Sequence, residues 1–282
     1  MQEKYVDAGG VRTFYLEAGD GPYLVLMHGG GIGIDANLTW FKNIEPLAER
    51  FHVIAFDQVG FGKTGMPNDP AHFTKLYRAQ HALAVLDALE IEQAILAGHS
   101  EGGLMASKIA VTHPKRVAKL VIIASGATAP LLGDERDEAA RKASAEAYDW
   151  ELEASSEDAY VQNFKRSMYY HPDRIDDDLL RANYREARDS GNLDLYLNLP
   201  PDVSDEKRYY AVAREHVHPY LPQLAMECLL LWANNDPTVP VARGLALMEM
   251  IPHGEMHILN YAKHMVMVDA SEGFNRALCG TS

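Results

Sequence analysis

The segment Gly98-His99-Ser100-Glu101-Gly102 places a serine between two glycines, each two residues away. An apolar run that ends at Ala97 predicts a buried strand before the serine, and residues 104–113 predict a helix after it. The two glycines allow so tight a turn that the serine is held in a strained conformation. Its hydroxyl then stands exposed beyond the strand, above the positive end of the helix. These features predict that Ser100 is a nucleophile, and the alternative is a glycine-rich turn with an idle serine.

A serine hydroxyl needs a general base to become a nucleophile, and the base needs an acid to orient it. Asp236 lies in the loop after a predicted strand, and we predict that it is the acid. Of the twelve histidines, His264 lies in the loop that should reach the carboxyl edge of the sheet, so we predict that it is the base. The alternatives are an Asx turn before Pro237 and a histidine of a surface loop.

A glycine-rich loop, His28-Gly29-Gly30-Gly31-Ile32-Gly33, follows an early predicted strand and can turn backbone N–H groups inward. We predict that the N–H groups of Gly30 and Glu101 bind the oxyanion of a reaction intermediate, with Gly29 and Gly31 beside the substrate. The alternative is a flexible loop. No Gly-Lys-Ser or Gly-Lys-Thr closes it, which argues against a phosphate loop. No histidine, cysteine or carboxylate grouping has metal-ligand spacing, so we expect no metal.

Strands and helices alternate along most of the chain. Short apolar strands are predicted at 11–17, 23–28, 53–57, 120–124, 228–233 and 256–259. Helices are predicted at 38–50 and 77–89. This alternation predicts an α/β fold with a mostly parallel sheet covered by helices on both faces.

The alternation stops between Gly133 and about Pro222, where the sequence is polar and helical. Residues 134–158 carry ten acidic against three basic residues, a net charge of −7. Helices are predicted near 135–150, 157–169 and 177–190. We interpret 134–222 as an inserted helical cap, and 1–133 with 223–282 as the core domain. The acidic run is interpreted as the solvated face of the cap.

Composition limits the class of partner. The formal net charge of −14 argues against nucleic acid and against anionic membrane surfaces. No run of about twenty apolar residues is present, and the N-terminus lacks the apolar segment of a signal peptide. The two cysteines, Cys228 and Cys279, are expected to be reduced. We therefore expect a cytoplasmic protein that acts on a small molecule, and the sequence leaves its oligomeric state open, a homo-oligomer included.

From about Val6 to Leu278 the chain resembles the α/β-hydrolase superfamily, and within it the meta-cleavage-product hydrolases. The similar segments are 6–12 (VDAGGVR), 28–33 (HGGGIG), 57–64 (DQVGFGKT) and 272–278 (EGFNRAL). This resemblance implies cleavage of a C–C bond in ring-fission products of aromatic degradation. A dienol substrate is first ketonised, and water activated with help from the triad then adds to the carbonyl. The resemblance implies no metal and no organic cofactor.

Several positions depart from the family pattern. His99 and Glu101 flank the serine where the family usually has asparagine and methionine. Thr39 aligns with an asparagine, Met265 with a tryptophan, and Asn183 with a cap arginine that grips the dienoate, although Arg181 and Arg185 lie near it. The resemblance thus implies substrate contacts at His99, Thr39, Asn183 and Met265. Further candidates for the pocket wall are Trp40, Trp150, Tyr169 and Tyr170.

The sequence therefore predicts a serine-dependent hydrolase of a small, largely apolar carbonyl compound, and favours C–C cleavage. A carboxylesterase or lactonase is the alternative within the same chemistry. The alternative of another class is a ligand receptor, or a biosynthetic enzyme that uses the triad without attack by water.

Overall fold

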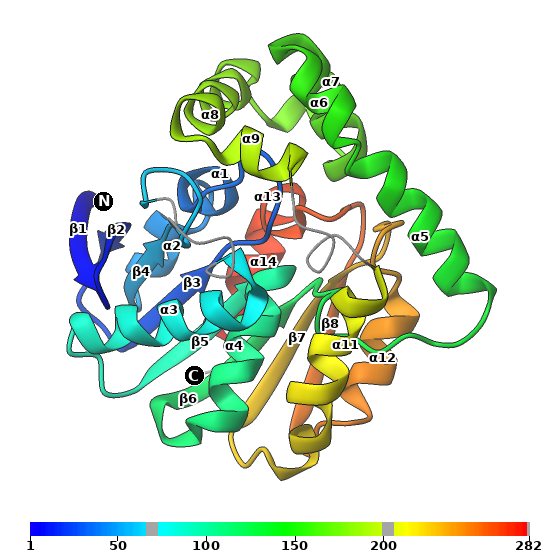
Figure 1. Ribbon diagram of the computed structural model, residues 1–282. Helices are drawn as coiled ribbons and strands as arrows, with labels where there is room; N and C mark the ends of the chain where they lie inside the picture. The colour runs from blue at the N-terminus through cyan, green and yellow to red at the C-terminus, as the bar shows by residue number, and fades with distance from the viewer. Residues whose placement is uncertain (66–72, 199–205, 281–282) are drawn as a thin grey trace.

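A computed structural model describes residues 1–65, 73–198 and 206–280 and contains an eight-stranded sheet (Figure 1). The strands are β1 (Gln2–Ala8), β2 (Val11–Ala18), β3 (Tyr23–Met27), β4 (His52–Phe56), β5 (Ala94–His99), β6 (Val117–Ile123), β7 (Glu227–Ala233) and β8 (Gly254–Leu259). Their order is β1-β2-β4-β3-β5-β6-β7-β8. The pairs β1–β2 and β2–β4 are antiparallel, and every pair from β4 to β8 is parallel. The predicted α/β class and mostly parallel sheet are confirmed.

The central strands are buried on both faces, because successive side chains of a strand point to opposite sides. Leu24 and Leu26 of β3 belong to one core cluster, whereas Val25 and Met27 belong to the other. The first cluster includes side chains of α1 (Ala36–Trp40), α13 (Val266–Asp269) and α14 (Ser271–Cys279). The second includes side chains of α3 (Lys75–Ala88), α4 (Glu101–Thr112) and α12 (Val241–Met248).

No helix in the described ranges is long and apolar enough to cross a bilayer.

Two local predictions differ from the structure. The helix predicted at 38–50 is divided into α1 and α2 (Ile44–Ala48). The turn between them is tied down by Asn43, whose Nδ2 donates to Met267 O at 3.0 Å and to Asn275 Oδ1 at 2.9 Å. Strand β1 was not predicted, because it is a largely exposed edge strand without a continuous apolar run.

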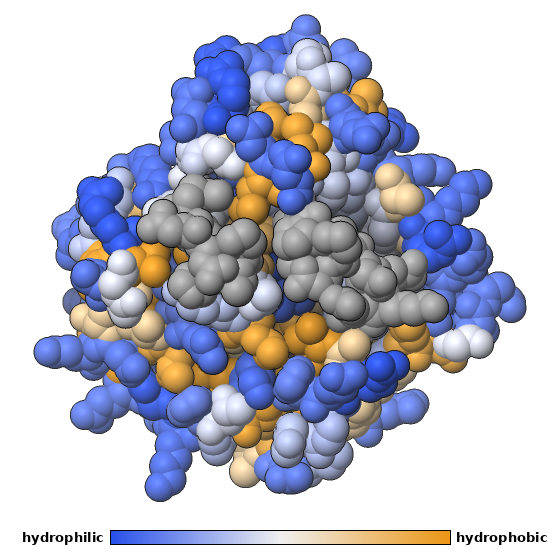
Figure 2. Space-filling model, in the orientation of Figure 1, coloured by the Kyte–Doolittle hydropathy of each residue, from blue (hydrophilic) through white to orange (hydrophobic). Residues whose placement is uncertain are grey.

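An inserted helical region lies between β6 and β7. It includes α5 (Glu135–Ala147), α6 (Trp150–Ser155), α7 (Glu157–Met168), α8 (Asp177–Ser190) and α9 (Asn192–Leu197). These helices arch over the sheet at the top of Figure 1, and their outer parts are largely hydrophilic in Figure 2. Most acidic side chains of residues 134–158 are exposed, as predicted, but Glu153 is buried.

The last helix of the insertion, α11 (Glu206–His216), packs against the core and not with the other helices of the insertion. Its Ala213, together with the following Val217 and Leu221, joins the core cluster of α3 and α4. The division into a core domain and a cap at residues 134–222 therefore stays a proposal.

Candidate active site

Ser100 occupies a sharp turn between β5 and α4, with φ 52° and ψ −120°. A Cβ atom on Gly98 would lie 2.1 Å from Gly102 O, and one on Gly102 would lie 2.3 Å from Met27 O. Only glycine fits at these two positions, which explains the sequence pattern. The Ser100 N–H donates to Ile123 O at 2.9 Å and thereby holds the turn against β6. The strained conformation predicted for Ser100 is confirmed.

Asp236 and His264 come together from the loops after β7 and β8. His264 Nδ1 lies 2.7 Å from Asp236 Oδ2. The other carboxylate oxygen, Oδ1, accepts from Thr238 N at 2.8 Å, Thr238 Oγ1 at 2.7 Å and Val239 N at 3.2 Å. Burial opposes ionisation of Asp236, but the charge of His264 and the hydrogen bonds hold its pKa below the ordinary value. An ionised Asp236 can only accept hydrogen bonds, so Nδ1 of His264 carries a proton.

When the imidazole of His264 is neutral, its remaining ring nitrogen, Nε2, presents a lone pair. Nε2 is buried and has no hydrogen-bond partner within the described ranges. His264 and Ser100 line the same cavity. An imidazole held in this tautomer is suited to accept the proton of a serine hydroxyl, and such contacts are often loose until substrate binds.

The two predicted oxyanion donors also line this cavity. Glu101 is the first residue of α4, where backbone N–H groups have no partner within the helix. In the part of the chain that the structure describes, neither the Gly30 nor the Glu101 N–H donates a hydrogen bond. The N–H of Gly31, in contrast, donates to Tyr196 Oη at 2.6 Å. Gly30 and Glu101 thus offer two N–H groups beside the serine, which is the arrangement that binds a developing oxyanion.

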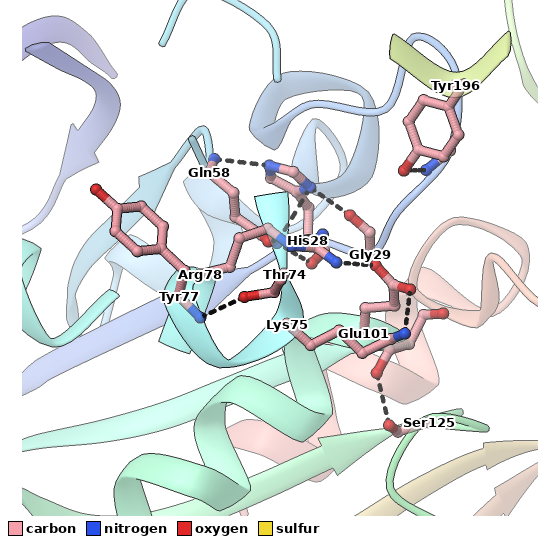
Figure 3. A network of polar contacts seen from close by, with 12 residues as sticks. His28, Gly29, Gln58, Thr74, Lys75, Tyr77, Arg78, Glu101, Ser125 and Tyr196 are labelled. Carbon is pink, nitrogen blue, oxygen red and sulfur yellow. Dashed lines mark hydrogen bonds and ion pairs between the residues drawn. The ribbon is translucent and has the colours of Figure 1, made fainter. Parts of the chain in front are cut away.

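The side chain of Glu101 forms a buried ion cluster that sequence reasoning missed (Figure 3). Glu101 Oε2 accepts from Arg78 Nη2 at 2.5 Å, and Oε1 lies 3.7 Å from Lys75 Nζ. Burial opposes ionisation of Glu101, but the two cations hold its pKa below the ordinary value. Burial lowers the pKa of Lys75 to about 8. The one indication of this cluster in the sequence is that Lys75 and Arg78 are three residues apart, which places them on the same face of a helix.

Two buried histidines near the serine serve structure. His28 Nε2 accepts from the backbone N–H of Gln58 at 3.0 Å, so its Nδ1 donates to Gly29 O at 2.7 Å. Burial lowers the pKa of His28 to about 3. His99 Nε2 donates to His264 O at 3.0 Å, and burial together with the charge of His264 holds its pKa well below the ordinary value. Both rings are neutral and fix the loops that carry the site.

The cavity has a volume of about 390 Å³, within the usual range for small-molecule sites. Trp150, a predicted wall residue, lines it. Sequence reasoning missed further wall residues, among them the large side chains of Arg141, Tyr148, Tyr196, Tyr209, Tyr210 and Arg243. The cavity is therefore strongly aromatic, with the reactive groups on one part of its wall.

The family description "alpha/beta hydrolase fold" matches residues 22–271. The chain belongs to the alpha/beta hydrolase fold family. It is 28% identical to the 2-hydroxy-6-oxo-2,4-heptadienoate hydrolase of Pseudomonas putida strain F1, over 97% of this chain and 93% of that one. It is 27% identical to the 2-hydroxymuconate semialdehyde hydrolase of Pseudomonas sp. strain CF600, over 95% and 89%.

Solved structures agree with these relatives. A mutant of the meta-cleavage product hydrolase CumD from Pseudomonas fluorescens IP01, complexed with acetates, superposes with a TM-score of 0.81. The two chains are 26% identical, and the match covers 98% of this chain and 96% of that chain. This hydrolase-fold chain is therefore similar over its full length to hydrolases of meta-cleavage products, as the sequence indicated.

Three of the predicted substrate contacts lie outside the cavity wall of this hydrolase. Thr39 is fully buried, and its Oγ1 donates to Asp35 O at 2.8 Å. Trp40 is fully buried in the core cluster beneath α1. Asn183 Nδ2 donates to Gly33 O at 2.9 Å and to Asp35 Oδ2 at 2.8 Å. Thr39, Trp40 and Asn183 therefore lie outside the wall of this cavity, and their side chains serve packing and loop support.

The other predicted contacts are divided between two places. Gly31 lines the main cavity, whereas Gly29, His99 and Met265 line a narrow crevice that shares Gly30, Gly31 and His264 with it. Tyr169 is buried in the core and Tyr170 is partly exposed at the surface. Arg181 and Arg185 form surface ion pairs with Asp158 and Glu157.

Proposed function

We propose that this protein is a serine-dependent hydrolase that cleaves a C–C bond in a ring-fission-type product. One observation carries the proposal: His264 is oriented by Asp236, and its free Nε2 is buried at the cavity that Ser100 also lines. Similarity to meta-cleavage product hydrolases over 95% or more of the chain supports this bond type. The aromatic wall of the cavity supports a small, largely apolar substrate.

Each group has a distinct role in the proposed reaction. The dienol substrate is ketonised, and His264 then takes a proton from water while the oxygen of that water bonds to the carbonyl carbon. In this route Ser100 polarises the same carbonyl, and the N–H groups of Gly30 and Glu101 hold the oxyanion. In the other route Ser100 itself bonds to the carbonyl carbon and gives its proton to His264, cleavage leaves an acyl-serine, and water then releases the acid and restores the serine hydroxyl. The C–C bond breaks, its electron pair passes to the dienolate fragment, and His264 returns the proton to that fragment. Asp236 stabilises the imidazolium throughout.

A second candidate is a carboxylesterase or lactonase, and the position of Asn183 favours it. Asn183 aligns with the arginine that grips the dienoate in the family, and it is bonded to loop atoms outside the cavity. The proposed triad and oxyanion donors would serve a C–O bond equally well, because the leaving group is protonated by the same histidine.

The purified protein, given a dienoate ring-fission product and a panel of aryl esters, separates these candidates by kcat/KM. We expect faster turnover of the ring-fission product, no turnover by Ser100→Ala, and near-normal turnover by Ser144→Ala, a control on the same cavity wall. Faster turnover of esters would instead establish the second candidate. Turnover of neither class by folded protein would favour a non-hydrolytic enzyme or receptor.

A further inference from the structure

Arg243 is a buried cation in the first turn of α12, with 1% of its surface exposed. Its Nε donates to Pro130 O at 3.0 Å, and its Nη2 donates to Gly126 O at 2.8 Å and Ala129 O at 2.6 Å. A guanidinium has five N–H donors, and these three bonds use those of Nε and Nη2. The two donors of Nη1 are left.

These two donors stand at the cavity. Arg243 and Gly126 both line it, and a Cβ atom on Gly126 would lie 3.6 Å from Arg243 Nη1. The ring of Tyr210, also on the wall, lies 5.0 Å from the guanidinium carbon. Across the described ranges, no hydrogen bond involves Nη1 and no carboxylate lies within 4.0 Å of Arg243. A buried charge without a counter-ion is unfavourable, and an anionic ligand would supply one.

The other charged side chains of the wall already have partners. The carboxylate of Glu101 is matched by Arg78 and Lys75 (Figure 3). The guanidinium of Arg141 is paired with Glu138, at 3.0 Å between Nε and Oε2. Within the described wall, Arg243 is therefore the charged side chain without a partner of opposite charge.

We propose that Arg243 Nη1 binds a carboxylate on the substrate, at the part of the wall formed by Gly126, Tyr210 and Arg243. This inference rests on the proposed function, since the carboxylate must occupy the cavity that presents Ser100. The anion site is formed by the core helix α12, the loop after β6 and Tyr210 of α11, not by the helices α5–α9. It would select acyl groups that end in a carboxylate over neutral acyl groups of the same length.

Two esters of matched length test the selection in the unaltered protein: mono-4-nitrophenyl glutarate and 4-nitrophenyl valerate. We expect a higher kcat/KM for the glutarate ester, although the net charge of −14 repels anions in general. Equal or faster hydrolysis of the valerate ester would overturn the proposal.

Variants then assign the selection to one side chain. Arg243→Gln should lower kcat/KM for the glutarate ester by about 10- to 100-fold and leave the valerate ester within about 3-fold, because a charged hydrogen bond is lost. Arg243→Lys should be intermediate, since it keeps the charge without the planar fork. Arg141→Gln, which removes a wall cation that is already paired, is the matched control and should leave the ratio of the two esters unchanged. An equal loss of kcat/KM for both esters in Arg243→Gln would show that Arg243 only stabilises the backbone of residues 126–130, and would refute the proposal.

Calorimetry keeps this proposal separate from the proposed function. Glutarate should bind the wild-type protein more tightly than glutaramide, and Arg243→Gln should abolish the difference. If folded protein turns over neither the ring-fission product nor either ester, the proposed function fails, while the glutarate titration still decides whether an anion site exists. Equal binding of glutarate and glutaramide by a protein that hydrolyses valerate esters would overturn the anion site alone.

Discussion

Asp236→Asn should nearly abolish turnover although the two side chains have almost the same size and shape. The three donors from Thr238 and Val239 converge on Oδ1, so the amide oxygen must take that position. The amide nitrogen then faces His264 Nδ1, where the carboxylate oxygen lies 2.7 Å away in the wild type. Because an amide nitrogen only donates, Nδ1 must present its lone pair and the proton moves to Nε2. That tautomer cannot accept a proton from Ser100.

The expected loss follows from this change of tautomer. The same substitution in a Ser-His-Asp triad lowers kcat by about 10⁴-fold, which corresponds to about 5 kcal/mol in the activation free energy. The assay is kcat on whichever substrate class the protein turns over, with circular dichroism to confirm folding. Thr238→Val is the control, because it removes one hydrogen bond to Oδ1 and leaves the carboxylate; we expect less than about a 10-fold loss. Activity of folded Asp236→Asn within about 10-fold of wild type would refute the proposed role of Asp236.

Three further predictions concern single substitutions at Glu153, Glu101 and Gly30. Burial raises the pKa of Glu153 from 4.5 to about 8, so the folded state resists an ionisation that the unfolded state undergoes, and stability falls as pH rises between these values. Between pH 5.5 and 8, this group should lower the free energy of unfolding of the wild-type protein by about 3 kcal/mol, as measured by urea unfolding. Glu153→Gln should remove this pH dependence. The same pH dependence in wild type and Glu153→Gln would contradict the prediction. Glu101→Gln leaves Arg78 and Lys75 buried without a counter-ion and should destabilise by about 3–5 kcal/mol in the same assay, whereas a change under about 1 kcal/mol would show that the cluster contributes little. In Gly30→Ala the methyl group would lie 2.5 Å from Glu101 Oε2, so kcat should fall by about 10²- to 10³-fold with a small change in KM; an unchanged kcat would exclude Gly30 as an oxyanion donor.

The parts of the site that the sequence predicted are those fixed by local geometry and chain order. The turn at Ser100 follows from glycines that nothing else can replace there, and the structure shows the strained φ. The pairing of Asp236 with His264 follows from loops after neighbouring parallel strands, whose carboxyl ends meet at one edge of the sheet. In both cases a short segment and its place in the strand order carry the information.

The cavity wall could not be predicted in this way. Tyr209 and Arg243 come from helices more than one hundred residues after Ser100, and their approach depends on how the insertion packs against the core. Trp40 was expected at the wall, but it is the last residue of α1 and is fully buried in the core cluster. Lysine and arginine side chains usually lie at the surface, so the burial of Lys75 could not be predicted from its residue type.

The most direct test of the central claim is the reaction of the protein with a fluorophosphonate probe, followed by mass spectrometry of its peptides. We predict one adduct on Ser100, formed at least about 10³-fold more slowly in His264→Ala. Folded wild-type protein without an adduct on Ser100, or labelling at an unchanged rate in His264→Ala, would contradict a serine activated by this histidine.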